Sequence, residues 1–167
     1  MRIASANRSQ ETVDRAVERC AETKRRNGTF NTSKPEQATY EMLIKVFGAD
    51  NVIRQYKNDS RYPFSADFYI KSLDLFIECN YSWTHKGRWF NLNSSEDRKE
   101  AEEMYQRYEK TGKRYYKNAA DTWTIRDVKK HTIALQNNLN YLVFWNLEEA
   151  MNYDFSKWRT SNEEDAA

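Results

Sequence analysis

Apolar residues recur along the chain with two spacings, one typical of helices and one typical of strands. Residues 10–26 carry a thin stripe of small apolar side chains and end at Asn27-Gly28, which predicts a helix with one weakly apolar face. A second helix is predicted to begin at Ser33-Lys34-Pro35-Glu36, because Ser33 can cap it and Glu36 stands at the capping-box position. Its core stripe, which Gly48 follows, consists of Tyr40, Leu43, Ile44 and Phe47.

The middle of the chain alternates with the period of two that is typical of strands. Residues 51–56 are predicted to form one strand, and 66–70 and 73–79 two more, with a turn near Lys71-Ser72. One face of the latter two strands is apolar, whereas Asp67 and Glu78 share the other face. With a two-residue turn, Asp67 lies opposite Phe76 and diagonal to Glu78, at about 7–8 Å. A different turn length would change this register.

The remainder of the chain predicts further helices and one more strand. Residues 95–110 read as a polar helix, 110–117 as a basic and aromatic loop, and 125–138 as another helix. The apolar strand 140–145 and a last helix over 147–153 follow. The order of helix, three strands, helix, strand and helix predicts an α/β domain whose mixed sheet carries helices on its faces.

Composition agrees with one globular domain and an appendage. The 167 residues are 39% apolar and include 24 aromatic residues, whereas glycine and proline together number six, which excludes fibrous and linker-like classes. No apolar run reaches the roughly 18 residues that span a bilayer, and the N-terminus lacks the apolar core of a secretory signal. Cys20 and Cys79 share no metal-ligand spacing, so we expect free thiols in a reducing cytoplasm.

The small net charge of +2 conceals a segregation of charge along the chain. Residues 1–34 and 81–134 each carry a net charge of +4, residues 35–80 carry −2, and residues 135–167 carry −4. Basic regions that flank an acidic centre are typical of a protein that binds a polyanion around a metal site. Ordinary solvated surfaces also produce segment charges of this size.

Asp67 and Glu78 are the candidate centre of chemistry. Hydrolysis of a phosphodiester needs an activated water and neutralisation of the phosphate charge, and Mg²⁺ held by one or two carboxylates supplies both. The alternative is a pair of solvated acids on an exposed sheet face.

Residues 64–85, FSADFYIKSLDLFIECNYSWTH, resemble the core of the PD-(D/E)xK nuclease superfamily. The resemblance is to the branch of the very-short-patch repair endonuclease and phage homing endonucleases, which reads as an aspartate strand, an apolar strand ending in Glu-x-(Asp/Asn), and then a histidine. Upstream, Glu36 and VIRQY at 52–56 resemble the family's first helix and strand. Downstream, Asn118, Arg126-Asp127 and LNYLVFWN at 139–146 resemble its closing helix and strand. The match spans residues 33–150, with an insertion at about 86–116.

The resemblance implies a role for each matching position. Asp67 would be the principal metal ligand and Glu78 the second, and Glu36 would bind a metal-bound water. Asn80 stands where the superfamily often has a lysine, and a neutral amide cannot supply that charge. His85 would then be the general acid or base, oriented by Asp127. Tyr81, where relatives favour glycine, is a second departure that puts activity in doubt.

Each of these residues also has a purely structural interpretation. Glu36 could serve only as a capping-box acid, His85 as a surface histidine, and Asp127 as an acid favoured by a helix N-terminus. Cys79 is expected to be a small core residue.

The resemblance implies DNA as the partner. Basic residues that could contact phosphates, and so give affinity without sequence choice, are Lys24, Arg25, Arg26, Lys34, Lys113, Arg114, Lys117, Arg126, Lys129 and Lys130. Trp83, Trp89 and Phe90 could wedge between base pairs as aromatics do in the repair relatives, although we expect two of the three to cover the core.

Taken together, the sequence predicts a restriction-endonuclease-like α/β fold and a metal-dependent endodeoxyribonuclease. Residues 1–32 would form a basic helical arm, 33–158 the nuclease domain and 159–167 a polar tail. The expected cofactor is Mg²⁺, for which Mn²⁺ can substitute. The expected enzyme nicks or cuts DNA and is a monomer or homodimer. We expect it in the cytoplasm, which for a phage-encoded protein is the cytoplasm of the host cell. The alternatives are a nuclease-fold protein that binds DNA without cleaving it and a viral protein–protein interaction module.

Overall fold

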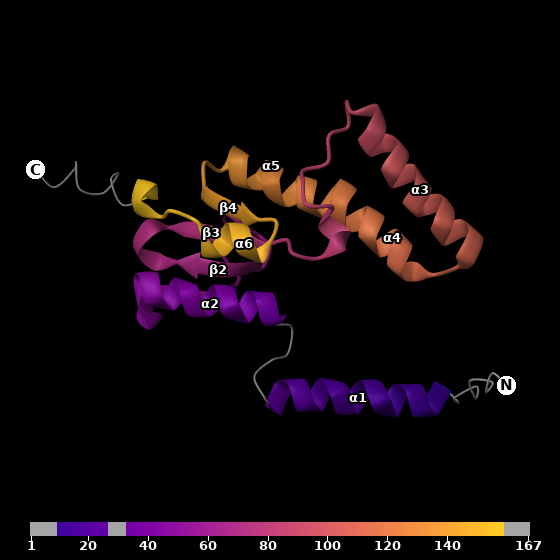
Figure 1. Ribbon diagram of the computed structural model, residues 1–167, viewed down its shortest axis with the longest axis horizontal. Helices are drawn as coiled ribbons and strands as arrows, with labels where there is room; N and C mark the ends of the chain where they lie inside the picture. The colour runs from indigo at the N-terminus through magenta and orange to yellow at the C-terminus, as the bar shows by residue number, and fades with distance from the viewer. Residues whose placement is uncertain (1–9, 27–32, 159–167) are drawn as a thin grey trace, which may run out of the picture.

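The structure of the chain, a computed structural model, describes residues 10–26 and 33–158 (Figure 1). Its centre is a four-stranded mixed sheet with helices on both faces. The strands are β1 (Val52–Tyr56), β2 (Ala66–Ile70), β3 (Leu75–Cys79) and β4 (Asn140–Phe144). The helices are α1 (Gln10–Arg26), α2 (Lys34–Phe47), α3 (Ser95–Thr111), α4 (Arg114–Asp121), α5 (Val128–Gln136) and α6 (Leu147–Met151).

The strands lie in the order β1-β2-β3-β4. The first three form an antiparallel meander, whereas β4 runs parallel to β3. A parallel pair needs a crossover connection, and here α3, α4 and α5 provide it. The predicted α/β architecture with a mixed sheet is therefore confirmed.

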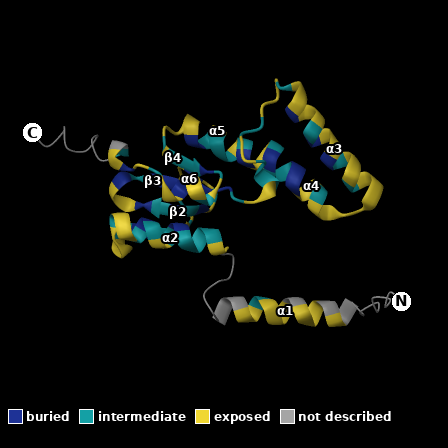
Figure 2. Ribbon diagram, in the orientation of Figure 1, coloured by how far each residue is buried: buried dark blue, intermediate teal, exposed yellow. Residues whose placement is uncertain are grey.

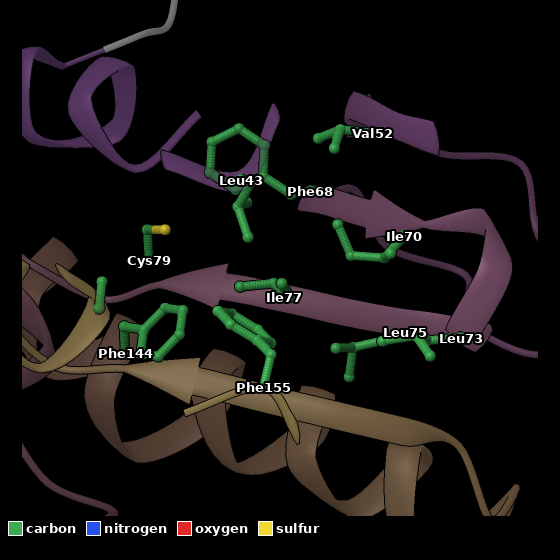
Figure 3. Packing of buried hydrophobic residues seen from close by; sticks show 11 residues of the cluster. Leu43, Val52, Phe68, Ile70, Leu73, Leu75, Ile77, Cys79, Phe144 and Phe155 are labelled. Atoms are coloured by element: carbon green, nitrogen blue, oxygen red, sulfur yellow. The ribbon is translucent and has the colours of Figure 1, made fainter. Parts of the chain in front are cut away.

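One face of the sheet is covered by α2 and α6 (Figure 3). Leu43 of α2 packs against Phe68, Ile70 and Ile77, and Phe144 of β4 extends the same cluster. These side chains are almost fully buried, as the helical spacing of α2 and the alternation of the strands require. Cys79 also lies in this cluster, which confirms it as a core residue.

The opposite face of the sheet is covered by α5. Ala134 of α5 packs with Phe76 of β3, Ala66 of β2 and Tyr62 from the loop before β2. Because both faces are covered, all five residues of β3 are buried. Glu78 is the only charged residue in this strand, so its carboxylate lies in the interior of the molecule.

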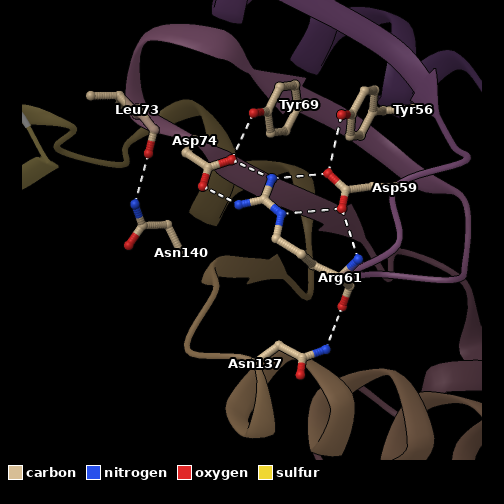
Figure 4. A network of polar contacts seen from close by, with 8 residues as sticks. All are labelled: Tyr56, Asp59, Arg61, Tyr69, Leu73, Asp74, Asn137 and Asn140. Carbon is tan, nitrogen blue, oxygen red and sulfur yellow. Dashed lines mark hydrogen bonds and ion pairs between the residues drawn. The ribbon is translucent and has the colours of Figure 1, made fainter.

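The connection between β2 and β3 is longer than the two residues that the sequence suggested. Ile70 pairs with Leu75, so four residues form the turn, and Asp74 ends it in the left-handed conformation at φ 45°. Aspartate tolerates this conformation better than most residues. Tyr69 Oη donates to Asp74 Oδ1 at 2.6 Å, and Arg61 bridges Asp74 to Asp59, so the turn is fixed by a polar network (Figure 4).

Helices α3 and α4 extend from the sheet and carry a small core of their own (Figure 1). Trp123 is fully buried there, donates from Nε1 to the carbonyl of Arg88 at 2.9 Å, and receives the edge of Phe90. Trp123 belongs to a π-helical segment, Thr122–Asp127, that joins α4 to α5. The prediction of a loop over 110–117 is correct only for Gly112 and Lys113, because α3 continues to Thr111 and α4 begins at Arg114.

Helix α1 precedes this domain and is exposed over nearly all of its described side chains (Figure 2). Ala16 and Cys20 of its predicted apolar stripe are exposed. The side chains of Lys24, Arg25 and Arg26 lie outside the described residues, as do residues 1–9, 27–32 and the tail 159–167. Over the described ranges, no helix combines the length and the apolar character that crossing a membrane requires.

Trp123 should be the main stabilising side chain of the small core that α3 and α4 share. We expect Trp123→Ala to lower the free energy of unfolding by about 3–5 kcal/mol, because it leaves a large cavity and removes a buried donor. The control Leu135→Ala, on the exposed face of α5, should change stability by less than about 0.5 kcal/mol. Urea denaturation checks both, and equal midpoints would contradict the assignment.

Candidate active site

Asp67 and Glu78 face each other across β2 and β3. The pairs Phe68–Ile77, Tyr69–Phe76 and Ile70–Leu75 set the register, and its continuation places Asp67 directly opposite Glu78. The predicted shared face is confirmed, but the predicted diagonal register is wrong, because the turn contains four residues instead of two. Directly opposed residues have Cβ atoms about 4.5–5.5 Å apart, closer than the diagonal neighbours that the sequence suggested.

The Glu78 carboxylate is only 3% exposed, and both of its oxygens have partners. Tyr62 Oη donates to Oε1 at 2.7 Å, and Lys130 Nζ of α5 donates to Oε2 at 2.8 Å. Burial raises the pKa of Glu78 to about 7, because desolvation outweighs the stabilisation that Lys130 and Tyr62 give to the ionised form. The negative charge of Asp67 raises this pKa further.

Asp67 lies where β2 begins and is held by the backbone of the neighbouring strand. The backbone N–H of Cys79 donates to Oδ2 at 2.7 Å, and Gln55 Nε2 donates to Oδ1 at 3.4 Å. Burial raises the pKa of Asp67, while the Cys79 N–H, Lys130 and His85 oppose the shift. Lys130 and His85 therefore lie close enough to act on the same carboxylate.

His85 is bound to Asp127, as the resemblance implied. His85 ends the short helical turn Trp83–His85, and its Nδ1 lies 2.7 Å from Asp127 Oδ2. The His85 side chain is 19% exposed and that of Asp127 only 4%, so neither is a simple surface residue. With Nδ1 engaged, Nε2 is the ring nitrogen that can give or take a proton.

One helical run supplies the partners of both His85 and Glu78. Asp127 ends the π-helical segment and Lys130 follows in α5, three residues later, so both side chains lie on the same helix face. Single π-helical turns inside α-helices are frequent at functional sites. Sequence reasoning placed Lys130 among the phosphate contacts and did not find Tyr62, because nothing in a helical lysine or a turn tyrosine signals a distant carboxylate.

Glu36 caps α2, and its carboxylate is also close to the site. Ser33 and Glu36 form the predicted capping box, with Ser33 Oγ 3.0 Å from Oε1. Burial raises the pKa of Glu36, and the negative charge of Asp67 raises it further. The capping role is confirmed, and Glu36 belongs to the surroundings of Asp67 as well.

Of the two residues that depart from the resemblance, Asn80 is buried and Tyr81 is partly buried. Asn80 is 5% exposed, and its backbone N–H donates to the carbonyl of Phe144 at 2.8 Å. Tyr81 packs against the core beneath α2 and shares a 2.7 Å hydrogen bond with Thr39. Tyr81 therefore serves the structure on the α2 side of the sheet.

The remaining basic and aromatic candidates take different places. Lys34, Arg126 and Lys129 are exposed, as phosphate contacts must be, whereas Lys117 pairs with Asp121 at 2.6 Å. Trp89 stacks on His131, and Phe90 packs against Trp123. Trp83 is 53% exposed beside His85, so two of the three aromatics pack inside the fold, as expected.

The donor set at the site suits a hard cation that keeps much of its water. Among residues 10–26 and 33–158, no group of three or more His, Cys, Asp or Glu side chains could enclose a metal ion. Asp67 and Glu78 are nevertheless an oxygen-only pair, and Mg²⁺ commonly takes one or two carboxylates and completes its shell with water and substrate oxygens. The residues thus fit an open Mg²⁺ site and not a closed one.

Comparison of the chain with protein-family models, with curated proteins and with solved structures finds no significant match.

The Glu78 carboxyl should titrate well above an ordinary glutamate. We expect a midpoint near 7 in carbon-detected NMR, and a higher one in Tyr62→Phe, which loses a donor to the ionised form. Because the folded-state pKa exceeds the unfolded one, Glu78 should destabilise the fold progressively as pH rises from about 4.5 to about 7.

Tyr56→Phe is the matched control for this titration, because Tyr56 Oη donates to Asp59 and not to Glu78. Its Glu78 midpoint should equal that of the unchanged protein. A Glu78 midpoint near 4.5 in the unchanged protein would show that the carboxylate is not buried in this way.

Proposed function

We propose that this protein is a Mg²⁺-dependent endodeoxyribonuclease with a restriction-endonuclease-like fold, which hydrolyses phosphodiester bonds in DNA by nicking or site-specific cutting. The observation that carries the proposal is the juxtaposition of Asp67 and Glu78 on adjacent strands, together with the hydrogen-bonded His85–Asp127 pair. The order of α2, three antiparallel strands, a helical crossover and a parallel fourth strand supports the fold assignment.

The two facing carboxylates would hold the metal ion. When bound, Mg²⁺ neutralises charge on the scissile phosphate and makes a coordinated water more acidic. Asp67 is fixed for this role by the Cys79 N–H, so its orientation does not depend on the substrate. The Glu78 carboxylate is buried and held in place by Tyr62 and Lys130.

His85 would move the proton that the reaction requires. Asp127 holds Nδ1 at 2.7 Å, which fixes the ring and leaves Nε2 to exchange a proton with the attacking water or the leaving oxygen. Glu36, close to Asp67 at the start of α2, would accept a hydrogen bond from a water in the site.

DNA would be held by exposed basic residues around this centre. Arg126 and Lys129 are exposed on the helical run that carries Asp127, and Lys34 is exposed at the start of α2. Contacts of this kind give strong dependence of binding on salt and little choice of sequence. The exposed Trp83 lies two residues from His85 and could contact bases near the scissile bond.

A second candidate function is DNA binding without cleavage. Asn80 is neutral, and the Glu78 carboxylate is paired with Lys130, so the charge of Glu78 is balanced by a side chain of the protein itself. A protein of this kind would bind DNA in a salt-dependent manner, and its binding would not change with Asp67→Ala.

The nuclease proposal is tested with supercoiled plasmid and Mg²⁺ or Mn²⁺. We expect the unchanged protein to nick the plasmid and Asp67→Asn to lose at least about 1,000-fold of the rate, because a principal metal ligand is removed. Asp50→Asn, at an exposed position in the turn before β1, is the matched control and should keep full activity. Salt-dependent binding without nicking by the unchanged protein would favour the second candidate.

The His85–Asp127 pair makes a separate prediction. His85→Ala should reduce the nicking rate by about 100- to 10,000-fold, the usual contribution of a general acid or base, while DNA affinity stays within about threefold. Asp127→Asn should reduce the rate less, because an amide can still hold the ring in place. His131→Ala, at the other histidine of the chain, removes a ring that stacks on Trp89 and should leave the rate near that of the unchanged protein. Equal rates for His85→Ala and His131→Ala would refute the role of His85.

A further inference from the structure

The ammonium group of Lys130 lies between the buried Glu78 carboxylate and solvent. Its Nζ is 2.8 Å from Glu78 Oε2 and 3.4 Å from the carbonyl oxygen of Ser65. The Lys130 side chain is 26% exposed, whereas that of Glu78 is only 3% exposed. Lys130 can therefore reach both the interior carboxylate and a ligand that approaches from outside.

Lys130 is also the cation that balances the negative charge of Glu78. The Asn80 amide is neutral, and the Asn80 backbone N–H is used by Phe144. Within the described residues, Glu78 has one ion-pair partner, Lys130, and its other oxygen is occupied by Tyr62. Both oxygens of Glu78 are therefore engaged in hydrogen bonds.

A divalent cation and this ammonium compete for the same oxygen. Like charges a few ångströms apart repel strongly even in a partly solvated site, so a metal ion on Glu78 Oε2 would drive Lys130 away. A lysine has a flexible four-carbon stem and a compact charge that suits a phosphate oxygen.

We infer that Lys130 is the missing positive charge of this site: it holds Glu78 in the metal-free protein and transfers to a phosphate oxygen of DNA when a divalent cation takes Glu78. This inference rests on the nuclease proposed above. It assigns Lys130 a positioning role in the metal-free protein and a substrate-binding role in the complex.

The first test measures Mn²⁺ binding to the DNA-free protein by electron paramagnetic resonance at pH 8.5. Lys130→Met should bind Mn²⁺ roughly tenfold more tightly than the unchanged protein, because a competing charge is removed. Lys129→Met removes the adjacent, exposed charge from the same helix and should leave the Mn²⁺ Kd unchanged. Equal Kd values for Lys130→Met and Lys129→Met would overturn the inference.

The second test measures plasmid nicking by the same protein. Lys130→Met should lose roughly 100-fold of the rate despite its tighter metal binding, because the phosphate loses a charged partner. Lys45→Met, at an exposed position near the end of α2, should nick at the unchanged rate. Full activity of Lys130→Met would also overturn the inference.

A third measurement follows Lys130 in the unchanged protein, where Lys130 still pairs with Glu78. It therefore does not depend on how well Lys130→Met folds. In the unchanged protein labelled at lysine side chains, Mg²⁺ should shift the NMR signal of the Lys130 Cε. This signal is assigned by comparison with Lys130→Arg, whose spectrum lacks it. A Lys130 signal that stays fixed while Mg²⁺ saturates the protein would overturn the exchange.

The two proposals fail in distinguishable ways. Mn²⁺ binding and nicking by the unchanged protein, with Lys130→Met matching its controls, would refute the Lys130 inference alone. A protein that binds no Mn²⁺ and nicks no DNA would refute the nuclease and the Lys130 inference together.

Discussion

A single ionisable side chain in the middle of the sheet governs the arrangement around it. Strand β3 is buried on both faces, and Glu78 is its only charged residue. A buried carboxylate is costly unless a cation and a hydrogen-bond donor compensate it. Tyr62, from the loop before β2, supplies the donor, and Lys130, from the helix over the same face, supplies the cation. The crossover therefore has to place α5 over this face of the sheet, at the height of Glu78.

The chemistry of the site follows from the same constraint. Asp127 and Lys130 project from one face of one helical run, so the helix that compensates Glu78 also orients His85. The result is a set of three acids, one lysine and one histidine, which come from four segments of the chain. Environments of this type are where pKa values depart from their ordinary range, as those of Glu78 and Asp67 do.

Much of the fold and part of the site could be predicted from the sequence. The period of two placed Asp67 and Glu78 on one face, and the capping signals of Ser33 and Glu36 fixed the start of α2. The register could not be predicted, because it depends on a four-residue turn that Arg61 stabilises from outside the hairpin. The role of Lys130 was missed for a similar reason: its partner lies 52 positions away in sequence, on a different element. Pairings that tertiary packing sets cannot be recognised from the spacing of residues along the sequence.

The separate core around Trp123 has a consequence for how such a protein can change over time. Helices α3 and α4 pack on Trp123, Phe90 and Met104, whereas the carboxylates rest on clusters formed by the sheet with α2 and α5. Substitutions, insertions or deletions in this outlying pair of helices would alter the surface next to His85 while the sheet keeps its own packing. Selection could thus vary this outer surface without disturbing the packing around Asp67 and Glu78.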